Sequence, residues 1–247
     1  RINTDLQDGL IRTRMVRFSG LVSRLRRLVR QTSAELGKKA ELVLHGEHNE
    51  VDIKVLDRMV APLEHIIRNA ISHGIESPIE RLNKGKPETG KITIDVSRDG
   101  SDVIVRISDD GAGVNVDRVR ARALELGLLG PEEEMNDNDV IQFILEPGFS
   151  TAQHVSQVAG RGVGMDVVRR NITELGGSIE IESELGEGTR FTIRLPLTLA
   201  ILDGQTVNVG NLQPLQGFFD GPCHGAGAGF GRNFGGDHQI LPNTTSR

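Results

Sequence analysis

Tryptophan and tyrosine are absent from the 247-residue sequence, and its few aromatic residues, 3% of the chain, are all phenylalanine. This scarcity disfavours the stacking platforms with which proteins bind single-stranded nucleic acid. The single cysteine, Cys223, excludes a disulfide framework within the chain and a cysteine-rich metal site. No apolar run approaches the roughly 18 residues that span a bilayer, and no signal peptide is recognisable. A net charge of −5 excludes a strongly basic, obligate nucleic-acid binder.

The sequence begins at Arg1 rather than at a methionine, so we expect it to be a piece of a longer protein. Its length suits one or two domains, with enough chain to bury a core. Ten of the first 40 residues are Arg or Lys, and leucines recur there at helical spacing, which predicts one or two amphipathic helices. A solvated helix that packs on a partner is the favoured interpretation, and a membrane or nucleic-acid face is the alternative.

Helical and strand patterns share the stretch from residue 41 to residue 197. Helices are predicted over residues 55–74 (with a kink at Pro62), 78–83, 116–126, 139–145 and 164–175. Strands are predicted at residues 92–97 and 103–107, joined by an Asp99-Gly100 turn, and at 179–181 and 191–195. Helices that flank antiparallel hairpins predict an α+β fold, a two-layer sandwich with one helical layer against a half-buried sheet.

The composition changes again after Val209. Ten of the 30 glycines lie between residues 204 and 236, together with half of the phenylalanines, and no periodicity survives there. Such a segment cannot offset the entropy lost on ordering, so we expect it to be disordered.

Two glycine-rich clusters are suited to holding a ligand through their backbones. Asp109-Asp110-Gly111-Ala112-Gly113 follows a predicted strand, where the glycines permit close approach and a carboxylate can accept a hydrogen bond from an amine such as that of adenine. A tight strand-to-helix turn is the alternative. Gly160-Arg161-Gly162-Val163-Gly164 precedes a predicted helix, whose N-terminal N–H groups form an anion site. The residues that a Walker A loop or a dinucleotide fingerprint requires are missing from it.

Two polar clusters complete the candidate site. His65, Asn69 and His73 are spaced four residues apart, along one face of the predicted helix. The carbonyl oxygen of Asn69 suits Mg²⁺, and His65 could accept a proton or polarise a phosphoryl group. Zinc binding and a plain polar helix face are the alternatives, and no third zinc ligand is evident. Phe149-Ser150-Thr151 follows Pro147-Gly148, where we expect either a lid over residues 146–162 with hydroxyls near phosphates, or a surface loop.

Together and in this order, the clusters resemble the ATP-binding domain shared by sensor histidine kinases, gyrase B, the mismatch-repair clamp and a heat-shock chaperone. More narrowly, the chain resembles chemotaxis-type (CheA-like) histidine kinases over residues 1–209. Strings that carry the resemblance are Pro62-Leu63-Glu64-His65, Arg68-Asn69-Ala70-Ile71-Ser72-His73-Gly74, Glu146-Pro147-Gly148-Phe149-Ser150-Thr151 and Gly160-Arg161-Gly162-Val163-Gly164-Met165-Asp166. The resemblance implies a Bergerat-type ATP-binding fold, a mainly antiparallel or mixed sheet covered on one face by helices, with an N-terminal helical extension.

The resemblance also implies roles for single residues. Asp109 would contact the adenine amine, Asn69 would hold Mg²⁺ against the phosphates of ATP, and His65 would serve phosphoryl transfer with His73 near the phosphates. Arg118 stands where the family often has a phosphate-binding lysine, with a different donor geometry. Ser72 stands where the family commonly has an aspartate, so that carboxylate is absent here. The remaining residues expected at ATP are Gly111, Gly113, Ser150, Thr151, Gly160, Arg161, Gly162, Val163 and Gly164.

The function that the resemblance implies is the ATP-binding catalytic module of a cytoplasmic two-component histidine kinase. The γ-phosphoryl group would go to a histidine on a separate phosphotransfer domain. The implied domains are a remnant of a dimerisation helix at 1–35, the catalytic domain at 36–198, and the start of an adaptor-binding domain at 199–247, truncated or frameshifted.

The implied partners are the phosphotransfer domain, a response regulator, an adaptor protein with a receptor array, and a second copy in a homodimer. No nucleic acid and no membrane span are expected. A non-catalytic nucleotide-binding scaffold is the alternative function. An ATP-operated clamp is disfavoured, because His65 stands where clamps carry a glutamate base.

Overall fold

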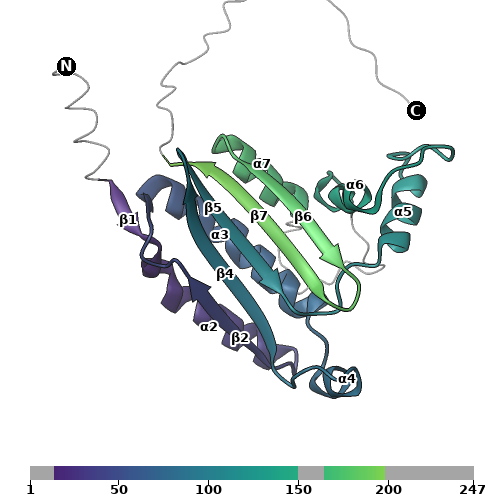
Figure 1. Ribbon diagram of the computed structural model, residues 1–247, viewed down its shortest axis with the longest axis horizontal. Helices are drawn as coiled ribbons and strands as arrows, with labels where there is room; N and C mark the ends of the chain where they lie inside the picture. Colours follow the sequence, from purple (N-terminus) through teal and green to yellow (C-terminus); the bar gives the residue numbers. More distant parts are fainter. Residues whose placement is uncertain (1–13, 150–163, 198–247) are drawn as a thin grey trace, which may run out of the picture. The chain divides into compact units, whose positions relative to one another are not determined.

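A five-stranded mixed sheet forms the centre of the computed structural model, which describes residues 14–149 and 164–197. The strand order is β2 (Ala40–His45), β4 (Gly90–Asp99), β5 (Asp102–Asp109), β7 (Gly188–Pro196), β6 (Ser178–Glu184). The pair β2 and β4 is parallel, and the other neighbours are antiparallel. The helices α2 (Val22–Glu35), α3 (Ile53–Asn69) and α7 (Met165–Glu174) cover one face of this sheet (Figure 1). The predicted two-layer α+β sandwich is therefore confirmed.

The remaining elements are short. A two-stranded sheet pairs β1 (Met15–Arg17) with β3 (Glu50–Asp52), and a 3₁₀ turn, Phe18–Leu21, leads from β1 into α2. The helices α4 (Pro78–Asn83), α5 (Val116–Glu125) and α6 (Asp137–Gln142) correspond to predicted helices. Their ends agree with the prediction within two residues, except that α6 ends at Gln142 instead of residue 145. The strands β1, β2 and β3 were not predicted, and β1 replaces part of the helical segment expected before residue 40. Three-residue strands are too short to produce a period-2 pattern, so only their pairing partners define them.

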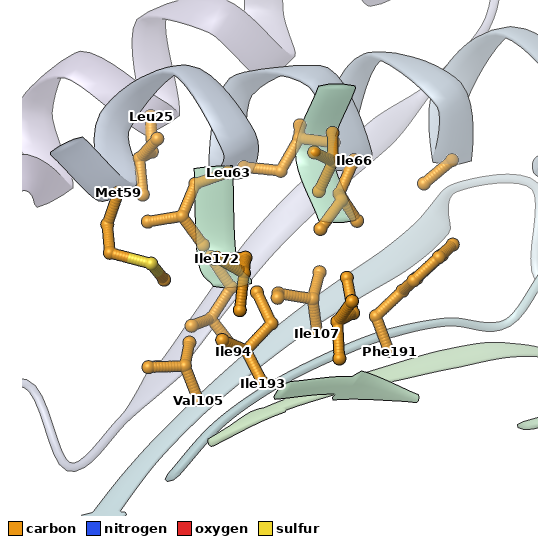
Figure 2. Packing of buried hydrophobic residues seen from close by; sticks show 14 of the residues in the cluster. Leu25, Met59, Leu63, Ile66, Ile94, Val105, Ile107, Ile172, Phe191 and Ile193 are labelled. Atoms are coloured by element: carbon orange, nitrogen blue, oxygen red, sulfur yellow. The ribbon is translucent and has the colours of Figure 1, made fainter. Parts of the chain in front are cut away.

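The apolar face of α3 packs against the middle of the sheet. Leu63, Ile66 and Ile67 are fully buried, and in Figure 2 Leu63 and Ile66 point toward Ile94, Ile107 and Ile193 of β4, β5 and β7. Buried positions alternate along β4 and β7, as expected for a sheet with one covered face, whereas in β5 the intervening Ile104 is buried as well. Burying such side chains contributes about 1.5–3 kcal/mol each, so this layer carries much of the stability of the fold.

Helix α2 shares this core. Leu25 and Val29 are buried in the same cluster as the side chains of α3. Helix α2 thus packs as part of the helical layer. The domain boundary expected near residue 35 stays a prediction. Among the described residues no helix is long and apolar enough to cross a lipid bilayer. The expected disorder after Val209, the lid over residues 146–162 beyond Phe149 and the whole segment assigned to an adaptor-binding domain lie outside the described residues.

Helix α3 begins at a buried cap. Asp52, 3% exposed, accepts a 2.8 Å hydrogen bond from the backbone N–H of Lys54. Arg14 forms a 2.9 Å ion pair with the same carboxylate. The helix then continues through Pro62 and passes into a π-helical turn, Ala70–Gly74. The predicted helix over residues 55–74 therefore corresponds to α3 plus this turn.

We predict that Asp52→Ala lowers the free energy of unfolding by about 1–3 kcal/mol, because it removes the cap of α3 and the charged partner of Arg14. Urea denaturation of the purified chain measures the change. Asp57→Ala is the matched control, since Asp57 is exposed on the same helix, and its effect should stay within about 0.5 kcal/mol. Equal losses in both variants would contradict the capping role.

Candidate functional site

The loop that follows β5 is held between two other segments. The N–H of Ala112 donates to the carbonyl oxygen of Gly74 at 2.8 Å, and the N–H of Gly186 donates to the carbonyl oxygen of Ala112 at 2.8 Å. Residues 109–113 therefore lie between the π-helical turn after α3 and the turn between β6 and β7. This contact brings the end of α3 and the end of β5 to one edge of the sheet.

Two glycines of this loop are required by the close approach. A Cβ on Gly111 would lie 2.3 Å from the carbonyl carbon of Gly74, nearer than any real contact. Gly113 has φ +69°, and a Cβ there would lie 2.1 Å from the carbonyl oxygen of Glu184. The close approach that these two glycines permit in the structure is to neighbouring backbone, and their predicted approach to a ligand stays a prediction.

Asp109 ends β5 as a carboxylate with unusual electrostatics. Burial raises its pKa to about 6, and the like charge of Asp110 adds to this effect. Hydrogen bonds from the N–H groups of Gly111, at 3.0 Å, and Thr189 oppose the rise, as does the charge of Lys86. In the described part of the chain no ion pair neutralises Asp109, so its oxygens are available to a ligand that donates hydrogen bonds.

Asp110, in contrast, belongs to a charge network. The fully buried Arg81 donates to the Asp110 carboxylate at 2.9 Å, to Glu76 at 3.1 Å and to the carbonyl oxygen of Pro87 at 2.7 Å. Lys86 donates to the carbonyl oxygens of Asp110 at 2.9 Å and of Gly111 at 2.7 Å. No sequence pattern predicted this network. A charged residue in a short helix normally lies in water, and no local pattern marks Arg81 as buried.

The ends of α3 and α7 meet beside this loop. The Asn69 amide donates a 3.2 Å hydrogen bond to the sulfur of Met165, the first residue of α7. No hydrogen bond reaches its side-chain oxygen from the described residues, so that oxygen is available for a cation. Gly164 is the N-cap residue of α7 and has no side chain, so it cannot cap the first N–H groups of this helix.

The two histidines flank Asn69. Burial lowers the pKa of the partly buried His65, the charges of Arg68 and His73 lower it further, and Asp166 opposes them. Partial desolvation and the charge of Lys38 lower the pKa of His73, which lies in the π-helical turn. Both rings are therefore mainly neutral at pH 7 and can accept a hydrogen bond or a proton. In residues 14–149 and 164–197 no group of three or more His, Cys, Asp or Glu side chains could hold a metal ion, so zinc has no third ligand there.

The other predicted site residues are only partly covered by the structure. Arg118 is exposed in the first turn of α5, where its N–H is capped by Asn115 at 3.0 Å, and no described contact joins its guanidinium to the rest of the site. Phe149 is buried with side chains of α5 and α6 in a second apolar cluster. The roles proposed for Ser150, Thr151, Gly160, Arg161, Gly162 and Val163 lie outside the described residues.

A family model described as "Histidine kinase-, DNA gyrase B-, and HSP90-like ATPase" matches residues 59–199. The chain is 46% identical over 205 residues to the chemotaxis protein CheA of Salmonella typhimurium, covering 83% of this chain and 30% of that protein. It is 44% identical over 210 residues to the sensor histidine kinase CheAY of Helicobacter pylori, covering 84% of this chain and 26% of that protein. The chain thus spans less than a third of the length of these relatives.

Solved structures give a weaker likeness. The histidine kinase AdeS of Acinetobacter baumannii matches with a TM-score of 0.45 at 17% identity, covering 74% of this chain and 66% of that one. A mycobacterial sensor histidine kinase, MprB, matches with a TM-score of 0.43 at 18% identity, covering 74% of this chain and 95% of that one.

The raised pKa of Asp109 predicts a pH-dependent stability. Between its usual value of 3.8 and about 6, the folded chain holds this proton and the unfolded chain releases it. The free energy of unfolding should therefore fall as the pH rises through this range. Because other groups also titrate there, the measurement is the difference between the Asp109→Asn variant and the wild type, by urea denaturation at several pH values. This difference should shift in favour of the variant by about 1–3 kcal/mol between pH 4 and pH 7. A difference that does not change with pH would contradict the assignment.

Proposed function

Because the chain belongs to the family of histidine kinase-, DNA gyrase B- and HSP90-like ATPases, we propose that it binds ATP with Mg²⁺ as the catalytic module of a chemotaxis-type histidine kinase. The γ-phosphoryl group of ATP would then pass to a histidine on a separate phosphotransfer domain. The observation that carries the proposal is the partly buried Asp109 beside Gly111 at the end of β5, which has no ion-pair partner among the described residues.

Asp109 recognises the adenine ring in this proposal. Above a pH of about 6 its carboxylate is mainly ionised and can accept a hydrogen bond from the exocyclic amine of adenine. Gly74 and Gly111 lie against this carboxylate without side chains, and a Cβ on either would come within 3.0 Å of its Oδ1. The arrangement leaves room at the carboxylate only because both positions are glycine. These features support a site for a flat ring that donates a hydrogen bond.

Asn69 holds the cation in this proposal. Its side-chain oxygen, which accepts no hydrogen bond from the described residues, is a hard ligand of the kind that Mg²⁺ takes, and Mg²⁺ supplies charge neutralisation at the phosphates when it is bound. The Met165 contact fixes the amide so that its nitrogen faces α7, which leaves the oxygen on the other side. The N-terminal N–H groups of α7, next to Asn69, favour negative charge of the phosphates.

His65 serves the phosphoryl-transfer step. Its lowered pKa keeps the ring neutral at pH 7, so it can accept a hydrogen bond or a proton near the phosphates. Most of the rate acceleration in such a transfer comes from positioning and charge neutralisation rather than from a covalent step on the protein. The acceptor histidine, a response regulator, an adaptor protein with its receptor array and a homodimer partner belong to this proposal through the longer relatives, as does a cytoplasmic location.

Two variants test the adenine contact and the metal–phosphate contact of the nucleotide separately. Asp109→Asn should weaken the binding of adenosine and of ATP alike, by about 10- to 100-fold, because losing a charged hydrogen bond costs roughly 1.5–3 kcal/mol. Asn69→Ala should weaken ATP in the presence of Mg²⁺ and leave adenosine within about twofold of the wild type. Isothermal titration calorimetry measures all four affinities. Equal losses for both ligands in Asn69→Ala would contradict the metal role, and an unchanged Asp109→Asn would contradict the adenine role.

Catalysis is tested by phosphoryl transfer from radiolabelled ATP to a phosphotransfer domain supplied from a chemotaxis kinase. We expect transfer by the wild type and a loss of about 100-fold or more in His65→Gln, with ATP affinity within a few-fold, because removing a general acid–base group costs about that factor. His48→Gln is the matched control, since His48 is exposed on the turn before β3. ATP binding without any transfer by the wild type would favour the alternative, a non-catalytic nucleotide-binding scaffold.

A further inference from the structure

Lys38 makes three hydrogen bonds to the turn that ends α3. Its ammonium group donates to the carbonyl oxygens of Ile71 and Ser72, both at 2.8 Å, and of Ile75 at 2.7 Å. An ammonium group has three N–H donors, so all of them are used. Burial lowers the pKa of Lys38, while Glu80 and Glu76 oppose this effect. The chain thus withdraws a positive charge from water and surrounds it with backbone oxygens.

The end of α2 directs Lys38 to this place. The N–H of Gly37 bonds to the carbonyl oxygen of Ala34 at 3.3 Å, and the N–H of Lys38 bonds to that of Ser33 at 2.9 Å. Gly37 has φ +62°, as a left-handed glycine after a helix requires. This pair of bonds is a Schellman motif, which fixes the backbone at Lys38 before β2 begins. The side chain is therefore held by a defined helix end rather than by a free loop.

The carbonyl groups that Lys38 binds have no partner within the helix. The last four carbonyl groups of a helix lack N–H donors, and here they belong to Ile71, Ser72, His73 and Gly74. Lys38 binds two of the four, and Ala112 of the loop after β5 binds Gly74. A cation is also favoured at this end by the helix dipole. Lys38 and the 109–113 loop thus hold the π-helical turn from two sides.

This turn separates Asn69 from Asp109. Asn69 is the last residue of α3, and Gly74 ends the turn against the Asp109 carboxylate, where a Cβ would lie 3.0 Å from Oδ1. Any displacement of the turn therefore changes the position of Asn69 relative to Asp109. Lys38 touches neither residue, and it precedes residues 59–199, which the family model matches.

We infer that Lys38 is a positioning residue for the nucleotide site, in which its ammonium group serves as a built-in cation that holds the π-helical turn against the 109–113 loop. The inference rests on the proposed function, because the site that it positions is the one proposed for ATP. Lys38, which lies before residues 59–199 that the family model matches, would thus take a direct part in shaping that site.

Lys38→Ala tests the inference, with Lys39→Ala as the matched control. Lys39 is the next residue, but its exposed side chain pairs with Glu88 at 2.6 Å. We expect Lys38→Ala to weaken ATP binding by about tenfold, as the loss of a charged hydrogen bond predicts, and Lys39→Ala to stay within about twofold. Amide hydrogen exchange gives a second readout without nucleotide. The N–H groups of Ile75 and Ala112, which bond to Ala70 and Gly74, should lose protection only in Lys38→Ala, while core amides of β5 keep theirs.

The outcomes are distinct. If the wild type does not bind ATP, the proposed function fails, and the exchange data alone judge whether Lys38 holds the turn. If the wild type binds ATP and Lys38→Ala binds it equally well, or if the Ile75 and Ala112 amides stay protected, the positioning role is overturned. Should Lys38→Ala lose cooperative unfolding, Lys38→Gln, which keeps two donors, replaces it. If both variants unfold, Lys38 is a general stability residue and the inference is overturned.

Discussion

The packing of α3 on the sheet determines where the candidate site can form. Leu63, Ile66 and Ile67 are locked into the core, so the helix can neither slide nor rotate without losing about 1.5–3 kcal/mol for each side chain exposed. The fixed position of the helix also fixes where the polar residues on its other face lie. Asn69 consequently ends α3 at the same edge of the sheet where β5 ends in Asp109. The 109–113 loop, bonded to Gly74 at the end of the π-helical turn, then holds the two halves of the site together.

The parts of this architecture that were predictable are the ones encoded locally. The hairpin of β4 and β5 has alternating apolar residues on both sides of Asp99-Gly100, and α4 begins at a capping box of Ser77 and Glu80, so both follow from short stretches of sequence. The strand β2 was missed, because its six residues are only partly buried and pair in parallel with a strand 50 residues away. Non-local pairing of that kind leaves no periodic signal.

The candidate site divides in the same way. Asp109, Asn69 and His65 were predicted from motif and spacing, and the structure brings the ends of their two elements together, while their roles stay predictions. Arg81 and Lys38 were missed for one physical reason. Each is a cation whose partners are mostly backbone carbonyl oxygens or distant carboxylates, and backbone oxygens carry no sequence identity. Side chains that donate hydrogen bonds can be identified from the sequence. The backbone carbonyl oxygens that they will bind cannot, because the fold determines which of these oxygens lack a backbone partner.

The two adjacent aspartates at the end of β5 have opposite surroundings, and this limits how the loop that follows can vary in length. Asp110 is neutralised by Arg81, whereas Asp109 lies against two glycines and has no ion-pair partner in the described part of the chain. Deleting one of the two aspartates would bring Gly111 to the position beside Arg81, which would then lose a carboxylate partner. Inserting a residue before Asp109 would put Asp109 beside Arg81 and leave the open position without its carboxylate. Among natural variants of this chain we therefore expect insertions and deletions at exposed turns such as Asp99-Gly100. We expect none between β5 and α5.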